Sequence, residues 1–237
     1  MLVHGFTQTG ASWGPLADEL AADHEVVRVD APGHGGSTAV RADLPAGAAL
    51  LGEAGGRATY VGYSMGGRLA LTLALARPDL VERLVLIGAT AGLDDPEARA
   101  ARRAQDEALA VRIEGDGVEP FLQSWLAQPL FAGLAPDPAD LAGRRRNTAA
   151  GLASALRLAG TGTMEPPLWN RLAALAAPTL VVAGARDAKF TALGRRIVTT
   201  VGANARLAVV PAAGHACHLE RPAAVLALLR SFLAATD

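Results

Sequence analysis

Short β-branched segments alternate with longer segments rich in Ala and Leu through the first part of the chain. Residues 25–30, 58–62 and 84–88 have the length and composition of strands that are buried on both faces of a sheet. The segments between them have helical length: 14–22, 44–53 and 67–76. Strands and helices alternate in this way when right-handed crossovers join neighbouring strands of a parallel sheet. The pattern predicts an α/β fold, with a mostly parallel sheet flanked by helices.

A long segment without strand character follows. Residues 95–169 contain helical stretches rich in Ala, Arg, Glu and Leu, interrupted by Gly and Pro, and strand-like segments resume only at 179–183 and 206–210. We therefore predict a core domain formed by residues 1–94 and 170–237. Residues 95–169 are expected to be inserted in it as a helical lid over the carboxyl edge of the sheet. Met1 lies directly against an expected strand that leads into His4-Gly5-Phe6. Sheets of this kind normally have further strands before that point, so a truncated or misassigned start is an alternative.

The composition restricts the classes of partner. The chain has 237 residues, of which 51% are hydrophobic and 19% charged, as expected for one globular α/β domain. A net charge of -1 gives no reason to expect nucleic acid or an anionic membrane as partner. The apolar runs are far shorter than the ~20 residues of a membrane span, and no export signal is recognisable. The lone Cys217 excludes an internal disulfide and favours a cytoplasmic location.

A G-x-S-x-G motif, residues 62–66, lies between a predicted strand and a predicted helix. A serine at such a sharp strand-to-helix turn is typical of a nucleophile elbow, in which small neighbouring residues leave room for the strained backbone. Ser64 is therefore a candidate catalytic residue. The alternative is a glycine-rich helix start without catalytic function.

An acid and a histidine follow Ser64 in the order that this motif requires. Asp187 comes directly after the strand-like segment 179–183, and His215 follows 206–210. Side chains beyond the carboxyl ends of parallel strands converge on one edge of the sheet. We predict that His215 accepts the proton of Ser64 and that Asp187 orients the imidazole. Taken singly, Asp187 could instead be a helix N-cap and His215 a packed loop residue.

The remaining candidates would stabilise charge on the substrate. The backbone amides of Phe6 and Met65 are the predicted oxyanion-hole donors. Arg68 lies one helical turn after Ser64 and is predicted to bind a substrate carboxylate, with an internal salt bridge to Asp30 or another acid as the alternative. Further cations near the expected site are Arg102, Arg103, Lys189 and the run Arg144, Arg145 and Arg146. No cofactor and no metal ligand set is expected.

Several motifs resemble one branch of the α/β-hydrolase superfamily. They are Gly62–Arg68, Trp125 with Gln128-Pro129-Leu130-Phe131, Gly160-Thr161-Gly162 with Pro167-Leu168-Trp169, and Asp187-Ala188-Lys189-Phe190. They are similar to the 2-succinyl-6-hydroxy-2,4-cyclohexadiene-1-carboxylate synthases of menaquinone biosynthesis, the MenH family. The resemblance covers nearly the whole chain.

The resemblance implies a lyase that eliminates pyruvate from a substrate with several carboxylates, with Ser64 acting as a base relayed through His215. Tyr63 and Trp125 are among the substrate-binding residues it suggests. One alternative is a carboxylester hydrolase using the same triad, although a neutral ester needs no cluster of cations. A second is a non-catalytic ligand receptor on the same fold. The expected partner is a small anionic molecule, and the protein is expected to be a monomer or small homo-oligomer.

Overall fold

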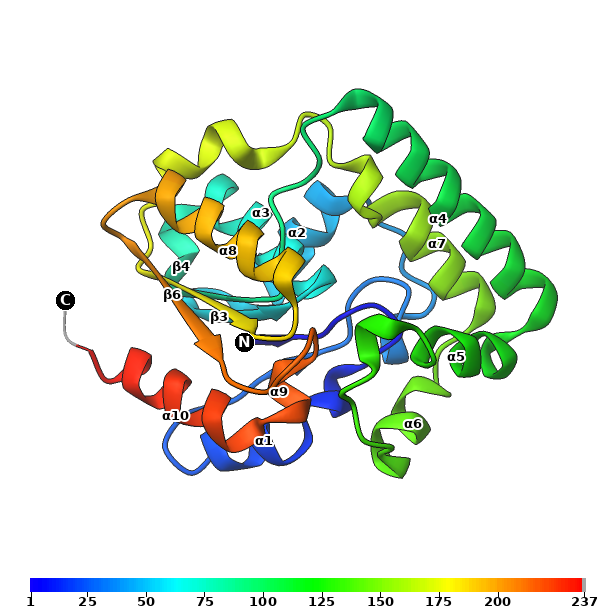
Figure 1. Cartoon of the computed structure of the whole chain (residues 1–237), viewed down its shortest axis with the longest axis horizontal. Coiled ribbons are helices and arrows are strands. Elements are labelled where there is room, and N and C mark those ends of the chain that lie inside the picture. Colours follow the sequence, from blue (N-terminus) through cyan, green and yellow to red (C-terminus); the bar gives the residue numbers. More distant parts are fainter. Residues whose placement is uncertain (236–237) are drawn as a thin grey trace.

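The computed structural model describes residues 1–235, and the last two residues of the predicted core segment lie outside that range. All neighbouring strands of the single six-stranded sheet run parallel, in the order β2-β1-β3-β4-β5-β6 (Figure 1). The strands are β1 Leu2–Val3, β2 Arg28–Val29, β3 Ala58–Tyr63, β4 Val81–Ile87, β5 Thr179–Gly184 and β6 Ala205–Val210. The helices are α1 Gly14–Leu20, α2 Leu44–Gly55, α3 Met65–Ala76, α4 Pro96–Asp116, α5 Val118–Leu126, α6 Pro138–Arg144, α7 Ala149–Ala159, α8 Ala188–Val201, α9 Cys217–Glu220 and α10 Pro222–Leu233. The predicted α/β class with helices on both faces of a parallel sheet is confirmed.

The two faces of the sheet have separate hydrophobic cores. Along β4, Leu84 and Leu86 pack into the core covered by α2, α3 and α8, whereas Val85 and Ile87 pack into the core covered by α1 and α10. Side chains of a strand alternate between the two faces, so a strand covered by helices on both sides must be apolar at every position. This requirement explains why the central strands appear in the sequence as continuous apolar runs.

The predicted strand 25–30 is much shorter in the structure. Only Arg28 and Val29 form β2, because this strand lies at the edge of the sheet and pairs only with the two residues of β1. Glu25 and Val27 are exposed to solvent. A β-branched segment at an edge lacks the second neighbour that would complete its backbone hydrogen bonds, so the regular pairing ends early.

The segment 95–169 is helical wherever it has regular structure, and it contributes no strand within the described residues. Its helices α4, α5 and α7 share a small core of their own, which includes Ile113, Phe121 and Leu152. The two ends of the segment meet at the core domain, since the Trp169 indole N–H donates to the Gly92 carbonyl over 3.1 Å. In Figure 1 these helices lie together at one side of the molecule, next to the ends of the strands.

The burial of His4, His34 and His218 makes the stability of the fold depend on pH. Burial lowers the pKa of His4 to about 4 and the pKa values of His34 and His218 to about 3. Between these values and about 6.5, the unfolded chain binds protons that the folded chain does not, so the free energy of unfolding decreases as the pH falls.

We expect each buried histidine to remove about 2 kcal/mol of stability between pH 7 and pH 5. Urea unfolding at the two pH values measures this loss. His34→Gln should make the pH dependence shallower, and the exposed His24 provides the matched control, His24→Gln, which should leave it unchanged. An equal pH dependence in all three proteins would contradict the expectation.

Candidate active site

Ser64 lies at the turn between β3 and α3 in a backbone conformation that side chains rarely adopt. Its φ and ψ angles are 51° and -105°. The Ser64 amide donates to the Ile87 carbonyl of β4 over 2.8 Å, which ties the turn to the neighbouring strand. A positive φ costs free energy and persists only where the surrounding structure enforces it, so the strained turn is a feature of the fold.

Two glycines of the motif make this turn possible. A Cβ atom on Gly62 would lie 2.4 Å from the Gly66 carbonyl oxygen, and a Cβ on Gly66 would lie 2.2 Å from the Val3 carbonyl oxygen. Both distances are too short for any side chain, so the turn packs against itself and against β1. The spacing of small residues in the sequence therefore reflects a close backbone approach on both sides of Ser64.

In the structure, Ser64, His215 and Asp187 form one hydrogen-bond network. The His215 Nε2 atom lies 3.3 Å from Ser64 Oγ, and His215 Nδ1 lies 2.8 Å from Asp187 Oδ2. His215 and Asp187 are buried, whereas Ser64 is partly accessible. With Asp187 accepting from Nδ1–H, the Nε2 atom is left as an acceptor for the serine proton.

Asp187 has both of the roles that the sequence left as alternatives. Its Oδ1 accepts the Phe190 amide at the start of α8 over 3.1 Å, while Oδ2 contacts His215. One carboxylate oxygen therefore caps the helix and the other faces the imidazole. The cap holds the carboxylate in a fixed orientation, which in turn limits the orientations open to the His215 ring.

Phe6 and Met65, whose amides are the predicted oxyanion-hole donors, line the same cavity as Ser64. Met65 is the first residue of α3, so its amide has no acceptor within the helix, and the positive end of the helix dipole lies there. Phe6 follows β1, and its amide donates to no protein acceptor among the hydrogen bonds of residues 1–235. Two unpaired amides next to a serine are what a developing negative charge on oxygen requires.

A cavity of about 290 Å³ opens above Ser64. Its wall is formed by residues of the sheet edge together with α4, α5, α6 and α7, so the helical segment completes the site. Of the residues predicted to act in the site, the cavity is lined by Phe6, Tyr63, Ser64, Met65, Arg68, Arg102, Trp125, Arg144, Lys189 and His215. Tyr63 also packs against the histidine, with ring centroids 5.3 Å apart.

The ionisable groups of the cavity wall, apart from His215 and Tyr63, are cations. Four of the lining residues are Arg or Lys, and none is Asp or Glu. Two of the arginines have carboxylate partners: Arg144 Nε donates to Asp140 over 2.6 Å, and Arg102 Nε donates to Asp106 over 2.9 Å. Arg68 and Lys189 have no ion pair among the described residues. The cavity thus has an unbalanced positive charge.

Arg68 is buried and interacts with the end of α7. Its guanidinium donates to the Ala159 carbonyl, so the predicted alternative of a salt bridge to Asp30 is wrong. The Asp30 carboxylate instead accepts the backbone amides of Gly10 and Gly36. Burial and the nearby Arg102 lower the pKa of Arg68 to about 10. The guanidinium is therefore charged at neutral pH. No carboxylate among the described residues lies within ion-pair distance of it.

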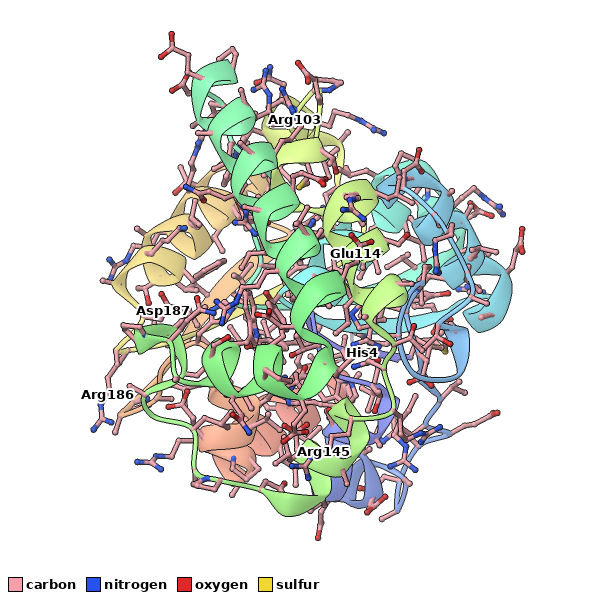
Figure 2. The ribbon with its side chains drawn as sticks, turned by 90° about the vertical axis from the view of Figure 1, so that its right-hand side faces the viewer. His4, Arg103, Glu114, Arg145, Arg186 and Asp187 are labelled. Atoms are coloured by element: carbon pink, nitrogen blue, oxygen red, sulfur yellow. The ribbon has the colours of Figure 1, made fainter. Side chains whose placement is uncertain are left out.

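Three predicted cations do not reach the cavity. Arg103 donates to the Gly162 carbonyl and pairs with Glu165, and Figure 2 shows it toward the outer end of α4, away from Asp187. Successive residues of an α-helix point about 100° apart, and here Arg102 faces the cavity while Arg103 turns to Glu165. Arg145 pairs with Glu119 on the surface, and Arg146 is exposed. Of the run Arg144, Arg145 and Arg146, only Arg144 lines the site.

Some residues of the cavity wall were not selected from the sequence. Phe190 packs on His215 with ring centroids 4.4 Å apart, and Phe131 and Gln8 also line the cavity. Phe190 and Phe131 lie in motifs that carried the family resemblance, so a signal for them was present. For Gln8 the sequence contains no such signal, because a glutamine in a turn is common. In the structure its Oε1 accepts the Gly5 amide.

Comparisons with known proteins show the family to which the chain belongs. Residues 1–228 match the alpha/beta hydrolase family. The chain is 34% identical to the 2-succinyl-6-hydroxy-2,4-cyclohexadiene-1-carboxylate synthase of Klebsiella pneumoniae, over 99% of this chain and 93% of that protein. MenH from S. aureus superimposes with a TM-score of 0.91 at 28% identity, covering 98% of this chain and 91% of that one. A thermophilic esterase from Thermogutta terrifontis has a TM-score of 0.75 at 26% identity, covering 98% and 88% of the two chains.

The two structural comparisons show that the chain is more similar to MenH than to the esterase. The esterase shares the overall arrangement, but the higher TM-score of the S. aureus protein means that the positions of most elements agree with MenH. The sequence identity to the synthase extends over nearly the full length of both proteins. The chain belongs to the alpha/beta hydrolase family and, within it, to the group of MenH-type synthases.

Proposed function

We propose that the protein is a 2-succinyl-6-hydroxy-2,4-cyclohexadiene-1-carboxylate synthase, a lyase that eliminates pyruvate from a polycarboxylate precursor. The observation that carries the proposal is the cavity above Ser64, whose wall has four cationic side chains and no carboxylate. Arg68 and Lys189 form no ion pair with the described residues, and a substrate with several carboxylates would provide their partners. The relatives with this synthase name add support.

The chemistry follows from the hydrogen-bond network. His215 Nε2 takes the Ser64 proton, and the serine oxygen removes a proton from a substrate carbon. The electrons of that C–H bond form a C=C bond, and the C–O bond to the three-carbon leaving group breaks. The leaving group departs as the enolate of pyruvate and gains a proton to become pyruvate. In this proposal the amides of Phe6 and Met65 stabilise negative charge on a substrate oxygen during proton removal.

The second candidate is a carboxylester hydrolase, which would use the same residues for acyl transfer. The similarity to an esterase at a TM-score of 0.75 favours it. The unpaired cations Arg68 and Lys189 speak against it, because a neutral ester gains nothing from a buried guanidinium without a carboxylate partner. A non-catalytic receptor is a third candidate, and a serine-directed phosphonate probe that fails to label Ser64 would support it.

The direct test is incubation with the pathway intermediate. Release of pyruvate together with appearance of the diene absorbance is the expected result. Hydrolysis of small esters without pyruvate release would overturn the lyase proposal in favour of the esterase.

Arg68→Ala provides a sharper distinction between the lyase and the esterase. We expect kcat/KM for the polycarboxylate substrate to fall by the equivalent of about 2–4 kcal/mol, since one partner of a buried charge pair is removed. Slow hydrolysis of a small neutral ester should be nearly unchanged. Arg112→Ala, on an exposed part of α4, is the matched control and should affect neither reaction. Equal losses on both substrates would mean that Arg68 supports the serine turn rather than the substrate.

We further propose that the enzyme acts in the cytoplasm on a small anionic molecule, as a monomer or small homo-oligomer, with residues 95–169 serving as the lid of the cavity. The burial of the single Cys217 is compatible with a reducing compartment. Within the described chain, no helix has the length and apolar character needed to cross a membrane. Gel filtration tests the oligomeric state, and the cellular distribution of a tagged chain tests the location.

A further inference from the structure

Asp106 is a buried carboxylate behind the cationic wall of the cavity. It lies on α4 with an exposed fraction of 2%, and it is not among the lining residues. Its Oδ1 accepts the Arg102 Nε–H over 2.9 Å. Its Oδ2 is buried and accepts no hydrogen bond from the part of the chain that the structure describes. A buried carboxylate with half of its hydrogen-bonding capacity unused is costly for stability alone.

Asp106 acts electrostatically on two cavity arginines, although it forms an ion pair only with Arg102. The Arg68 and Arg102 guanidinium groups repel each other, which contributes to the lowered pKa of Arg68. Asp106 acts on Arg68 in the opposite direction, and both arginines in turn oppose the increase that burial causes in the pKa of Asp106. Asp106 thus offsets the charge of one cation and leaves the group with one net positive charge facing the cavity.

Close packing at the end of α7 excludes solvent from Asp106. A Cβ atom on Gly160 would lie 2.4 Å from Asp106 Oδ2, so only glycine allows the end of α7 to approach the carboxylate so closely. The preceding residue, Ala159, provides the carbonyl that accepts from Arg68. Three elements, α3, α4 and the end of α7, therefore meet at this group of charges.

We propose that Asp106 is a positioning residue that holds Arg102 beside Arg68 to form a carboxylate-binding subsite before the substrate arrives. The side chain of Arg102 is 35% exposed, and without Asp106 it would be driven by repulsion from Arg68 toward solvent. Binding would then require the arginine to be ordered again, at an entropic cost. The inference rests on the proposed function, because the subsite serves a substrate carboxylate.

The test is a double-mutant cycle between Asp106 and Arg102. We expect Asp106→Asn to raise KM for the polycarboxylate substrate about 5–20-fold with kcat within about threefold of wild type. In an Arg102→Ala background the same change should alter KM by less than about twofold, because Asp106 acts through Arg102. Asp116→Asn removes an exposed pair of the same spacing on the same helix, with Arg112, and should change nothing.

A purely structural role gives a different pattern. In that case Asp106→Asn would lower the melting temperature and would change KM equally in the wild-type and the Arg102→Ala backgrounds. This result would overturn the proposal. A lowered KM, as expected if Asp106 only weakens the positive potential, would overturn it as well. Should the asparagine variant not fold, the smaller polar variant Asp106→Ser replaces it in the same cycle.

Citrate binding measured by calorimetry separates this inference from the proposed function. Wild-type protein should bind this tricarboxylate, and Asp106→Asn should weaken the binding about 5–20-fold. Citrate binding with this loss but no pyruvate release would refute the synthase function and retain the subsite. Citrate binding that is unchanged in the variant, or absent from wild type, would refute the subsite.

Discussion

Replacing Ser64 with alanine is expected to lower kcat for pyruvate release by about 10²–10⁴-fold. The serine oxygen is the only protein atom in the proposed mechanism that contacts the substrate proton, and His215 Nε2 lies 3.3 Å behind it. The effect could be larger than that of a single general base, because residues of a triad act as a unit. Initial rates of pyruvate formation with saturating substrate measure it.

The controls for Ser64→Ala address folding and position. The circular dichroism spectrum should be unchanged, since alanine removes one hydroxyl from a turn held by backbone contacts. Ser124→Ala, which removes a hydroxyl bonded to the Phe121 carbonyl in the helical segment, should retain wild-type kcat. Activity of the Ser64 variant within a fewfold of wild type would refute the role assigned to this residue.

Asp187→Asn is the second change with a large expected effect, on the order of 10²–10⁴-fold in kcat. The asparagine carbonyl oxygen can still accept the Phe190 amide and cap α8, but the NH₂ group then faces His215 Nδ1 in place of an acceptor. The imidazole is driven to the tautomer with its proton on Nε2, so it can no longer accept the serine proton.

Turnover and stability together separate the two roles of Asp187. Since asparagine caps a helix nearly as well as aspartate, the loss of stability should be at most ~1 kcal/mol. Asp43→Asn provides the matched control: Asp43 caps α2 by accepting the Ala46 amide over 2.8 Å and has no histidine partner. Similar melting temperatures with a loss of turnover only at position 187 would support the triad. Unchanged turnover in both variants would reduce Asp187 to a helix cap.

The order and type of the main elements could be predicted because they depend on local composition. Central strands covered on both faces must be apolar at every position, and β3, β4 and β5 were identified within a few residues of their ends. The edge strand β2 was predicted too long, because only its place in the sheet order limits its pairing to two residues. Apolar composition does not distinguish an edge from a centre.

The sequence by itself determined the residue types at the site, through a glycine spacing that a strained turn requires and through the order in which Ser64, Asp187 and His215 follow strands. Only the tertiary structure decided which cations face the cavity. Arg102 and Arg103 are neighbours in the chain, yet Arg102 lines the cavity and Arg103 turns to Glu165. Arg144 lines the cavity from the last position of α6, whereas Arg145 and Arg146 follow the helix and are exposed. The partner of Arg68 could not be predicted either, because the Ala159 carbonyl is 91 residues away in sequence. It comes near Arg68 only when the end of α7 meets α3 in the folded chain. The local sequence pattern indicates which residue types are available for catalysis and binding. The interactions between charges depend on distances, and these distances are determined by tertiary packing.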